Sequence, residues 1–414
     1  MTTDHIFNSS ENTTGTGQKN YLRKKKIIQY LYNNDTASNP ELCRYINSTA
    51  PSVSKLLSEL IEAKIVNEVG FGASIGGRRP NVYALIPTAR YTVGVYIDRK
   101  EYMIAVFDLS KKVVGEIIKV RLDMENSLRY INEIHKSVND HLEKQNIKRD
   151  KILGIGFSLP GLINSETGYS YTNLNITKGA LADMLAEKFQ MDVCIENDAR
   201  VMALAEQLFG AAKDEKNAMC IIVGGGVGMG MIINGKLYQG DNGFAGEFGH
   251  IQLNPNGDLC ECGKIGCLET MASGKALILG VLNDLEKGNL SRIKEIIKEK
   301  ELTVDLIVQA ARSGDQYAIS KFTEIGEYMG KGIAVLLHLL NPGKIIIGGV
   351  YSNAGEYIID PIMQALNKYA INDIKKQTDV MVSSLGRDAA LIGTLPLVMN
   401  RVFMDTNSQM VNSL

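Results

Sequence analysis

The chain has 414 residues, of which 45% are hydrophobic and 22% are charged, so it is long enough to bury more than one core and is expected to form two or three domains. No apolar run approaches the roughly 20 residues that span a bilayer, and the first residues lack the basic start and apolar middle of a signal peptide. These features argue against a membrane or secreted protein and predict a folded cytoplasmic one.

Charge is distributed unevenly along the chain. The formal net charge is only −1, but positions 1–90 hold 11 basic and 7 acidic residues, against 34 and 39 in the remainder. The asymmetry makes the N-terminal part the candidate for contact with an anionic partner. Residues 1–19 are polar and rich in Asn, Thr and Ser, and are predicted to be a disordered tail.

Residues 20–88 predict a compact unit of three helices. The first helix runs to Asn33, the second begins near Asn39, and the third follows a short turn with Thr49 as its N-cap. The apolar positions recur at helical spacing, which predicts one buried face on each helix. The side chains expected to turn inward are Ile27, Ile28, Leu31, Leu42, Tyr45, Ile46, Val53, Leu56, Leu57, Leu60 and Ile61.

A DNA-reading surface is predicted around the third helix. Its other face carries Ser52, Ser54 and Lys55, small donors near the end where a recognition helix reaches base edges. The following segment, IVNEVGFGASIGGRRPNVYALI, reads as two short strands whose Gly-rich loop holds Arg78 and Arg79. Together these features predict a winged helix-turn-helix that binds operator DNA, with the arginines in the minor groove. Winged helices also serve as protein-interaction modules, but the basic balance favours DNA.

Beyond residue 87 the pattern changes to alternating strands and helices. TVGVYIDR, YMIAVFDL and VVGEIIKVRL read as strands, and they are followed by a helix near Leu128 to Gln145 and the strand ILGIGFSL. The same kind of unit returns with AMCIIVGGGVGMGMIING, a helix at Glu324 to Leu340 and the strand KIIIGGV. This repetition predicts two α/β lobes with a cleft between them.

The stretch CECGKIGCLE contains three cysteines, and the first of them lies ten residues after a histidine. Three thiolates and one imidazole suit a closed tetrahedral zinc site, which leaves no place for an activated water and is therefore structural. Gly263 and Gly266 are expected to let the loop fold tightly. A turn with free thiols is the alternative. The predicted ligands are His250, Cys260, Cys262 and Cys267.

Four motifs resemble the ROK family, whose name joins repressors, open reading frames and kinases. They are SLPG, IENDAR, VGGGVGMG and the long segment from GFAGEFGH to GCLETMAS. The winged helix resembles the family's sugar-responsive branch, that of the N-acetylglucosamine and xylose repressors. The resemblance implies an α/β chain with a two-lobed actin-like (ribonuclease H-like) sugar-kinase fold. Lobe 1 is expected over 89–200 plus 385–405, and lobe 2, with the zinc loop, over 201–384.

The resemblance also assigns residues to a sugar site. Positions that match the family's sugar contacts are Asn197, Asp198, Glu247, His250 and Glu269. Carboxylates and amides suit paired hydroxyls because they exchange several hydrogen bonds with them. His250 would place one ring nitrogen on zinc and the other toward the sugar, and the zinc loop would carry Glu269 into the site. Asp198 matches the base of the family's kinases.

The phosphate side departs from the kinase pattern. The family's kinases begin this region with a motif close to GxDxGGTK, and here Tyr96, Asp98, Arg99 and Lys100 stand where Asp, Gly, Gly and Thr belong. Gly225 replaces a usual Thr in the second phosphate loop. Since the missing glycines let backbone amides approach phosphate, nucleotide recognition is expected to be lost.

The sequence therefore predicts a transcriptional repressor without catalytic residues. A homodimer, or a dimer of dimers, would bind operator DNA and release it when a sugar or sugar phosphate binds. The first alternative is an ATP-dependent sugar kinase with an added DNA-binding domain, in which Asp198 is catalytic. The second is repression controlled by a partner protein, with a vestigial sugar site.

Overall fold

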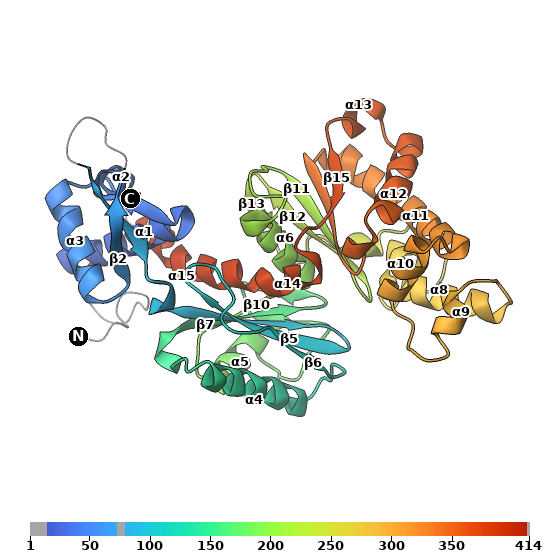
Figure 1. The fold of residues 1–414 in the computed structure, drawn as a ribbon, viewed down its shortest axis with the longest axis horizontal. Helices are drawn as coiled ribbons and strands as arrows, with labels where there is room; N and C mark the ends of the chain where they lie inside the picture. Colours follow the sequence, from blue (N-terminus) through green and yellow to red (C-terminus); the bar gives the residue numbers. More distant parts are fainter. Residues whose placement is uncertain (1–14, 73–78, 412–414) are drawn as a thin grey trace.

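The computed structural model describes residues 15–72 and 79–411 (Figure 1). Arg78 and most of the predicted tail lie outside the described residues. The predicted tail is too long, because helix α1 (Thr16–Asn34) already begins at Thr16. No helix in the described ranges is both long and apolar enough to cross a membrane.

The N-terminal elements form the expected winged helix. They are α1, β1 (Thr36–Ser38), α2 (Asn39–Tyr45), α3 (Ala50–Glu62), β2 (Val66–Phe71) and β3 (Asn81–Leu85). The three strands pair antiparallel in the order β1-β3-β2. Strand β1 was not predicted, because three residues are too few to carry a periodic pattern. Ser38 ends it and, with Glu41, forms a capping box that starts α2.

Two of the residues expected to turn inward in the winged helix are instead exposed. Tyr45 is 46% exposed and packs at a tilt against Tyr30 with ring centroids 4.6 Å apart, and Ile61 is 39% exposed. At about 100° per residue, Ile61 lies about 90° from the centre of the buried stripe of α3, so it sits at the edge of that stripe. Thr49 precedes α3 as expected, but its side chain makes no capping hydrogen bond.

Lobe 1 is built on a five-stranded sheet in the order β10-β7-β4-β5-β6. The strands are β4 (Tyr91–Ile97), β5 (Glu101–Asp108), β6 (Ile118–Arg121), β7 (Ile152–Leu159) and β10 (Val193–Asn197). Helices α4 (Leu128–Lys144) and α5 (Leu181–Phe189) cover one face, and α15 (Thr394–Val411) covers the other (Figure 1). The pairs β4–β7 and β7–β10 are parallel, and the other two pairs are antiparallel.

Lobe 2 repeats this topology. Its sheet has the order β13-β12-β11-β14-β15, and the pairing directions match those of lobe 1 strand for strand. The strands are β11 (Ala218–Val223), β12 (Val227–Ile233), β13 (Lys236–Tyr238), β14 (Lys344–Gly349) and β15 (Asp379–Val382). Two sheets of this strand order and direction confirm the predicted actin-like, ribonuclease H-like fold.

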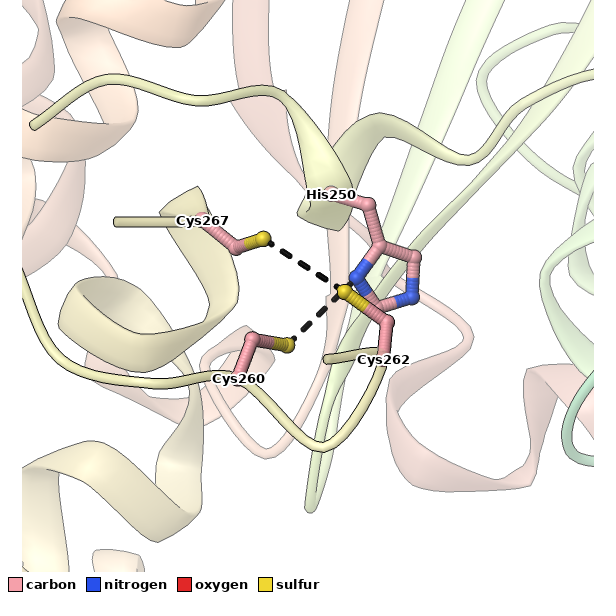
Figure 2. A group of neighbouring side chains, drawn as sticks. All are labelled: His250, Cys260, Cys262 and Cys267. Carbon is pink, nitrogen blue, oxygen red and sulfur yellow. Dashed lines mark hydrogen bonds between the residues drawn. The ribbon is translucent and has the colours of Figure 1, made fainter. Parts of the chain in front are cut away.

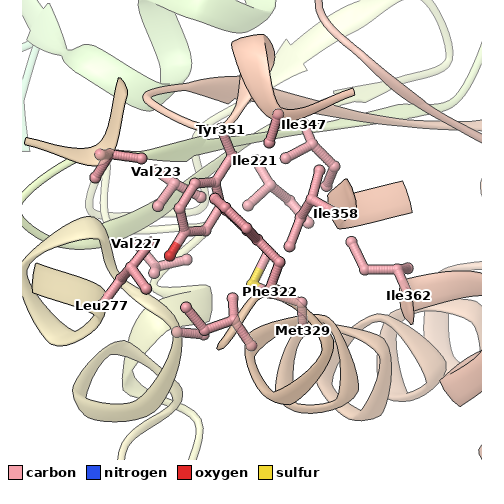
Figure 3. Close-up of a cluster of buried hydrophobic side chains, with 14 of the residues drawn as sticks. Ile221, Val223, Val227, Leu277, Phe322, Met329, Ile347, Tyr351, Ile358 and Ile362 are labelled. Atoms are coloured by element: carbon pink, nitrogen blue, oxygen red, sulfur yellow. The ribbon is translucent and has the colours of Figure 1, made fainter. Parts of the chain in front are cut away.

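Helices pack on lobe 2 and supply most of its core. The main ones are α7 (Leu268–Ala272), α8 (Gly274–Glu286), α10 (Val304–Arg312), α11 (Gln316–Leu340) and α12 (Glu356–Tyr369). The short helices are α9 (Ile293–Ile296) and α13 (Asn372–Lys375), whereas α14 (Ala389–Ile392) contacts α6 and strands β4 and β5 of lobe 1. Ile221 and Ile347 on neighbouring strands face Phe322 and Met329 of α11 (Figure 3). This buried apolar layer makes lobe 2 a rigid support for the loops at its edge.

The parts of the chain are joined by packing as well as by sequence. Helix α6 (Asp198–Phe209) contacts β11 and β12 of lobe 2 and also α15, so the boundary expected after residue 200 falls inside a helix. The core of the winged helix continues into lobe 1 as one apolar cluster, in which the Tyr32 and Phe403 rings lie 5.7 Å apart. A displacement of α15 would therefore alter the packing of the winged helix.

Candidate functional site

Four predicted metal ligands converge in lobe 2 (Figure 2). The candidate atoms of His250, Cys260, Cys262 and Cys267 all lie within 4.8 Å of one another. Cys260 Sγ lies 3.6 Å from His250 Nδ1, and the sulfurs of Cys262 and Cys267 are 3.7 Å apart. Around a tetrahedral zinc with Zn–S bonds of about 2.3 Å, sulfurs stand roughly 3.7 to 3.8 Å apart. The side chains thus fit a zinc ion in both type and spacing.

The loop reaches this shape because two glycines adopt left-handed backbone conformations. Gly263 has φ 82° and Gly266 has φ 75°. A Cβ on Gly266 would lie 1.5 Å from the carbonyl oxygen of Asn254, which no side chain tolerates. The backbone N–H of Cys260 donates to Lys264 O at 2.7 Å and closes the turn. The predicted role of both glycines is confirmed by these angles.

The three thiols differ in protonation. Burial raises the pKa of Cys260, and burial followed by the neighbouring thiols raises the pKa of Cys267 to about 12. At Cys262, burial is outweighed by hydrogen bonds from the backbone and the neighbouring thiols, which lower its pKa. Metal binding would release the protons that Cys260 and Cys267 hold. The cluster has the composition and spacing of a structural metal site.

Asn197 and Asp198 stand where β10 ends and α6 begins. Asn197 Oδ1 accepts hydrogen bonds from the backbone N–H groups of Ala199 at 3.0 Å and Arg200 at 3.3 Å, so it caps α6. Its Nδ2 donates to Gly161 O at 3.0 Å. Both lone pairs of Oδ1 are thus engaged, and one Nδ2 hydrogen of Asn197 remains for a ligand.

Asp198 is the most perturbed acid of the site. Burial is the main cause, and the charge of Asp98 adds to it, so that the pKa of Asp198 rises to about 7. The resemblance aligns Asp98 with a glycine of the family's kinases, and here its charge adds to the rise in the pKa of Asp198 that burial causes. A carboxyl group that titrates near neutral pH can either accept or donate a hydrogen bond there.

Glu247, His250 and Glu269 complete the set around the zinc loop. His250 turns Nδ1 toward the cysteines and Nε2 toward Glu247, whose Oε2 lies 3.8 Å away. Glu269 follows Cys267 by two residues, and its Oε2 accepts from the backbone N–H of Val227 at 3.0 Å. In addition to burial, the charge of Glu247 raises the pKa of Asp198, and the charge of Glu269 raises the pKa of Glu247. The structure therefore brings the predicted sugar residues of the two lobes within electrostatic reach of one another.

A buried ion pair supports this arrangement and was not predicted. Arg200 Nε donates to Glu196 Oε1 at 2.6 Å, with both side chains almost fully buried. Gln239 donates to the other oxygen of Glu196 at 2.6 Å, and Arg200 Nη2 donates to Ile163 O at 2.7 Å. The pair thus ties the start of α6 to segments 163 and 239. The only signal in the sequence was the four-residue spacing of Glu and Arg in IENDAR.

On the phosphate side, the Arg99 side chain crosses from lobe 1 to the zinc loop. Its guanidinium donates to Glu261 Oε1 at 3.2 Å and to Oε2 at 2.8 Å, and Lys275 also donates to Glu261. A Cβ on Gly225 would lie 3.5 Å from Arg99 Cδ, so Arg99 also lies against the Gly-rich turn between β11 and β12. The resemblance aligns this turn and the segment that carries Arg99 with the phosphate loops of the family's kinases.

The residues predicted to bind DNA differ in their surroundings. Lys55 and Arg79 are exposed, and Ser52 is half-buried. Ser54 is exposed, but its Oγ accepts a hydrogen bond from Asn39 Nδ2 at 2.8 Å. The Ser54 hydroxyl is therefore already engaged in a contact between α2 and α3. Arg78 lies outside the described residues.

A winged helix built onto two ribonuclease H-like lobes, with a Cys3His loop at their junction, defines a class of regulator derived from a sugar-kinase scaffold. The ROK family model matches residues 92–401, so the chain belongs to the ROK family.

Relatives of two kinds are similar to this chain. The DNA-binding transcriptional dual regulator NagC of Escherichia coli (strain K12) is 33% identical over 356 residues, 84% of each chain. A xylose repressor of Caldicellulosiruptor bescii is 31% identical over 389 residues, 92% of this chain and 96% of its own. A glucokinase of Halalkalibacterium halodurans is 33% identical over 308 residues, 73% of this chain and 93% of its own.

A solved structure matches the whole architecture. It is a ROK family transcriptional regulator, a homolog of the E. coli MLC protein, with a TM-score of 0.76 and 26% identity. The match covers 95% of this chain and 98% of the solved one. Regulators therefore share the winged helix and both lobes with this protein, whereas the glucokinase spans about three quarters of it.

Proposed function

We propose that this protein is a sugar-responsive transcriptional repressor of the cytoplasm. The winged helix binds operator DNA, and a sugar or sugar derivative at the junction of the lobes changes their geometry so that DNA is released. The observation that carries the proposal is the single apolar cluster that joins the winged helix to lobe 1, with Tyr32 against Phe403. Through it a movement of the lobe reaches the DNA-binding surface.

The sugar site in this proposal uses groups from both lobes. Asn197 and Asp198 belong to the start of α6, while Glu247, His250 and Glu269 belong to the zinc loop and the turn before it. Three carboxyl groups and an amide can exchange hydrogen bonds with several vicinal hydroxyls at once. Because the two sets lie on different segments, a bound sugar would fix their separation. That is how ligand binding would select one lobe arrangement.

Zinc has a structural part in the proposal. The ion would be held by His250, Cys260, Cys262 and Cys267, and when bound it supplies a rigid, closed anchor without a water ligand. The protein itself then aims His250 Nε2 at Glu247 and sets Glu269 against Val227. Loss of the anchor would loosen both side chains together.

A sugar kinase remains the second candidate function, supported by one observation. Asp198 matches the base of the family's kinases and has a pKa of about 7, the range in which a general base works best. Against it stands Arg99, which lies along Gly225 and pairs with Glu261 where nucleotide phosphates would need backbone amides and a metal. The whole-length similarity to regulators also favours repression.

Two measurements on the full chain test the proposal. Fluorescence anisotropy of labelled promoter DNA should show binding that falls when glucose, N-acetylglucosamine, xylose or one of their phosphates is added. A coupled assay for ADP with the same sugars should show no turnover. Sugar-dependent ADP production would establish the kinase instead, and DNA binding indifferent to every sugar would support control by a partner protein. A homodimer, or a dimer of dimers, on a near-palindromic site is the expected species.

A further inference from the structure

An open pocket of about 490 Å³ lies in lobe 1. It is lined by β9 (Tyr169–Ser170), which pairs with β8 (Ile163–Asn164), and by the loop that follows β9. Small-molecule sites enclose roughly 300 to 1,000 Å³, so the pocket has room for a ligand group. Its lining residues are Tyr169, Ser170, Tyr171, Asn175, Ile176, Thr177 and Lys178. None of them belongs to the sugar site described above.

The lining has the chemistry of a carbohydrate subsite. Tyr169 and Tyr171 are 39% and 51% exposed, and their ring centroids are 6.3 Å apart. Such rings offer an apolar face for the C–H side of a pyranose and a hydroxyl at their edge. Asn175, Thr177 and Lys178 add hydrogen-bonding groups around it. A purely apolar ligand would leave these polar groups without partners.

One wall of the pocket is bonded to the segment that Asn197 holds. The Asn197 amide donates to Gly161 O, and the next residue, Leu162, is bonded to the two residues that follow β9. Leu162 O accepts from Tyr171 N at 2.9 Å, and Leu162 N donates to Thr172 Oγ1 at 3.0 Å. Asn173 Nδ2 also donates to Pro160 O. Tyr171 is therefore bonded to the residue that follows Gly161, whose carbonyl group binds Asn197.

The opposite side of Tyr171 meets the segment that carries Glu247. Phe244 packs edge-on against Tyr171 with centroids 5.2 Å apart, and Glu247 follows three residues later. Asn164 donates to Asn242 O at 3.1 Å, which fastens the same two segments. Tyr171 thus lies between the segments that hold Asn197 and Glu247, at the edge of the sugar site.

We infer that this pocket is a second sugar subsite, so that the effector is a disaccharide or longer glycoside. The inference rests on the proposed function, because the first ring occupies the residues from Asn197 to Glu269. The second ring stacks on Tyr171 and Tyr169, and its hydroxyls reach Asn175, Thr177 and Lys178. A monosaccharide fills only the first subsite, and the aromatic pocket then remains filled with solvent.

The test compares matched mono- and disaccharides by calorimetry on the full chain. The pairs are glucose and cellobiose, N-acetylglucosamine and N,N′-diacetylchitobiose, and xylose and xylobiose. In one pair the disaccharide should bind at least tenfold more tightly. Tyr171→Ala should lower that disaccharide affinity to the monosaccharide level and leave the monosaccharide affinity unchanged. Tyr171→Phe, which keeps the ring, should retain most of the difference.

A matched control is Tyr45→Ala, which removes an equally exposed tyrosine from the winged helix. It should leave both affinities as in the parent, and circular dichroism melts should show that every variant is folded. Equal affinities within every pair, or a disaccharide preference that survives Tyr171→Ala, would overturn the subsite and leave the proposed repressor standing. If no sugar of the panel binds or releases DNA, the proposed sugar response itself fails and the subsite falls with it.

Discussion

Arg99 and Glu261, which are 162 positions apart in the chain, form a two-pronged ion pair between the turn after β4 and the zinc loop. Glu261 stands between two of the predicted zinc ligands, and Lys275 is its second partner. The bond from Arg99, then that from Lys275, lowers the pKa of Glu261 to about 2. The two residues connect lobe 1 to the cysteine-rich loop that precedes Glu269.

Removing this pair should change sugar response more than stability. About half of each side chain is exposed, and exposed pairs are worth less than about 1 kcal/mol. Arg99→Ala should therefore lower the unfolding free energy by less than that, yet weaken sugar binding roughly two- to fivefold because the zinc loop loses its tie to lobe 1. Calorimetry and urea unfolding measure the two effects.

The neighbouring pair provides a control for Arg99. Lys100 binds Glu301 at 2.8 Å with both side chains more than two-thirds exposed, so Lys100→Ala should change neither quantity. Glu261→Gln should reproduce the effect of Arg99→Ala, and the double variant should be no worse than either single one. Additive effects of the two substitutions would show that Arg99 and Glu261 act separately.

Loss of metal from the zinc loop should be accompanied by a loss of sugar affinity. The purified protein should hold one zinc per chain, and Cys260→Ser should lower both the zinc content and the sugar affinity, because the loop carries Glu269. Elemental analysis and calorimetry test this. Cys43→Ser, in the winged helix, is the matched control and should change neither. Protein without zinc, in which all three loop thiols titrate freely, would refute the site.

The wing predicts a salt-dependent defect in DNA binding alone. Replacing Arg78 and Arg79 with Ala should weaken operator binding and lower the slope of log K against log salt by about one unit for each lost phosphate contact. Sugar affinity should stay as in the parent. Arg129→Ala, an exposed arginine on α4, should leave the salt slope unchanged. A double variant that binds operator like the parent would show that the wing does not touch DNA.

The third helix predicts a change in base preference. Lys55 is exposed on the outer face of α3 and Ser52 is half-buried there, so Lys55→Ala and Ser52→Ala should alter which operator bases are favoured. Selection from a randomised operator library measures this. Ser54→Ala should act differently and lower stability, because Ser54 bonds to Asn39 between the two helices.

Local patterns in the sequence predicted most elements of the fold. The strands ILGIGFSL and KIIIGGV lie where their apolar runs placed them, and α4 ends one residue before its expected Gln145. Helix α11 begins at Gln316, eight residues before Glu324, because its first two turns carry fewer apolar residues. Burial within a helix depends on neighbours from elsewhere, which explains why Tyr45 was misplaced.

The candidate site was predictable in composition but not in its connections. Ligand types and spacing identified the Cys3His cluster, since all four residues lie close in sequence. The contacts of Arg99 with Glu261 and of Tyr171 with Phe244 join segments far apart in the chain. No local periodicity encodes such pairs, because they follow from how the two repeated lobes face each other.

Asp198 predicts a pH-dependent effect on stability. Its pKa of about 7 in the folded protein lies above the unfolded value of about 4, so the folded state holds a proton that the unfolded state loses between those pH values. The associated stability is present below about pH 4 and is lost as pH rises to about 7. Asp198→Asn should therefore raise the unfolding free energy above pH 7, on the order of 1–3 kcal/mol. Urea unfolding at pH 5 and pH 8 measures it, with Asp183→Asn as an exposed control.

The same substitution separates a repressor from a kinase. In a kinase, Asp198→Asn would abolish turnover and leave much of the sugar binding in place. In the proposed repressor there is no turnover to lose, and the variant should bind sugar more weakly by about 1.5–3 kcal/mol, the usual worth of a hydrogen bond to a charged group. It should bind operator as the parent does and release it only at much higher sugar, as a super-repressor. Calorimetry and operator-release curves for parent and variant decide this. Unchanged affinity together with unchanged release would remove Asp198 from the sugar site, because a buried carboxyl group that bonds the ligand cannot be replaced without effect.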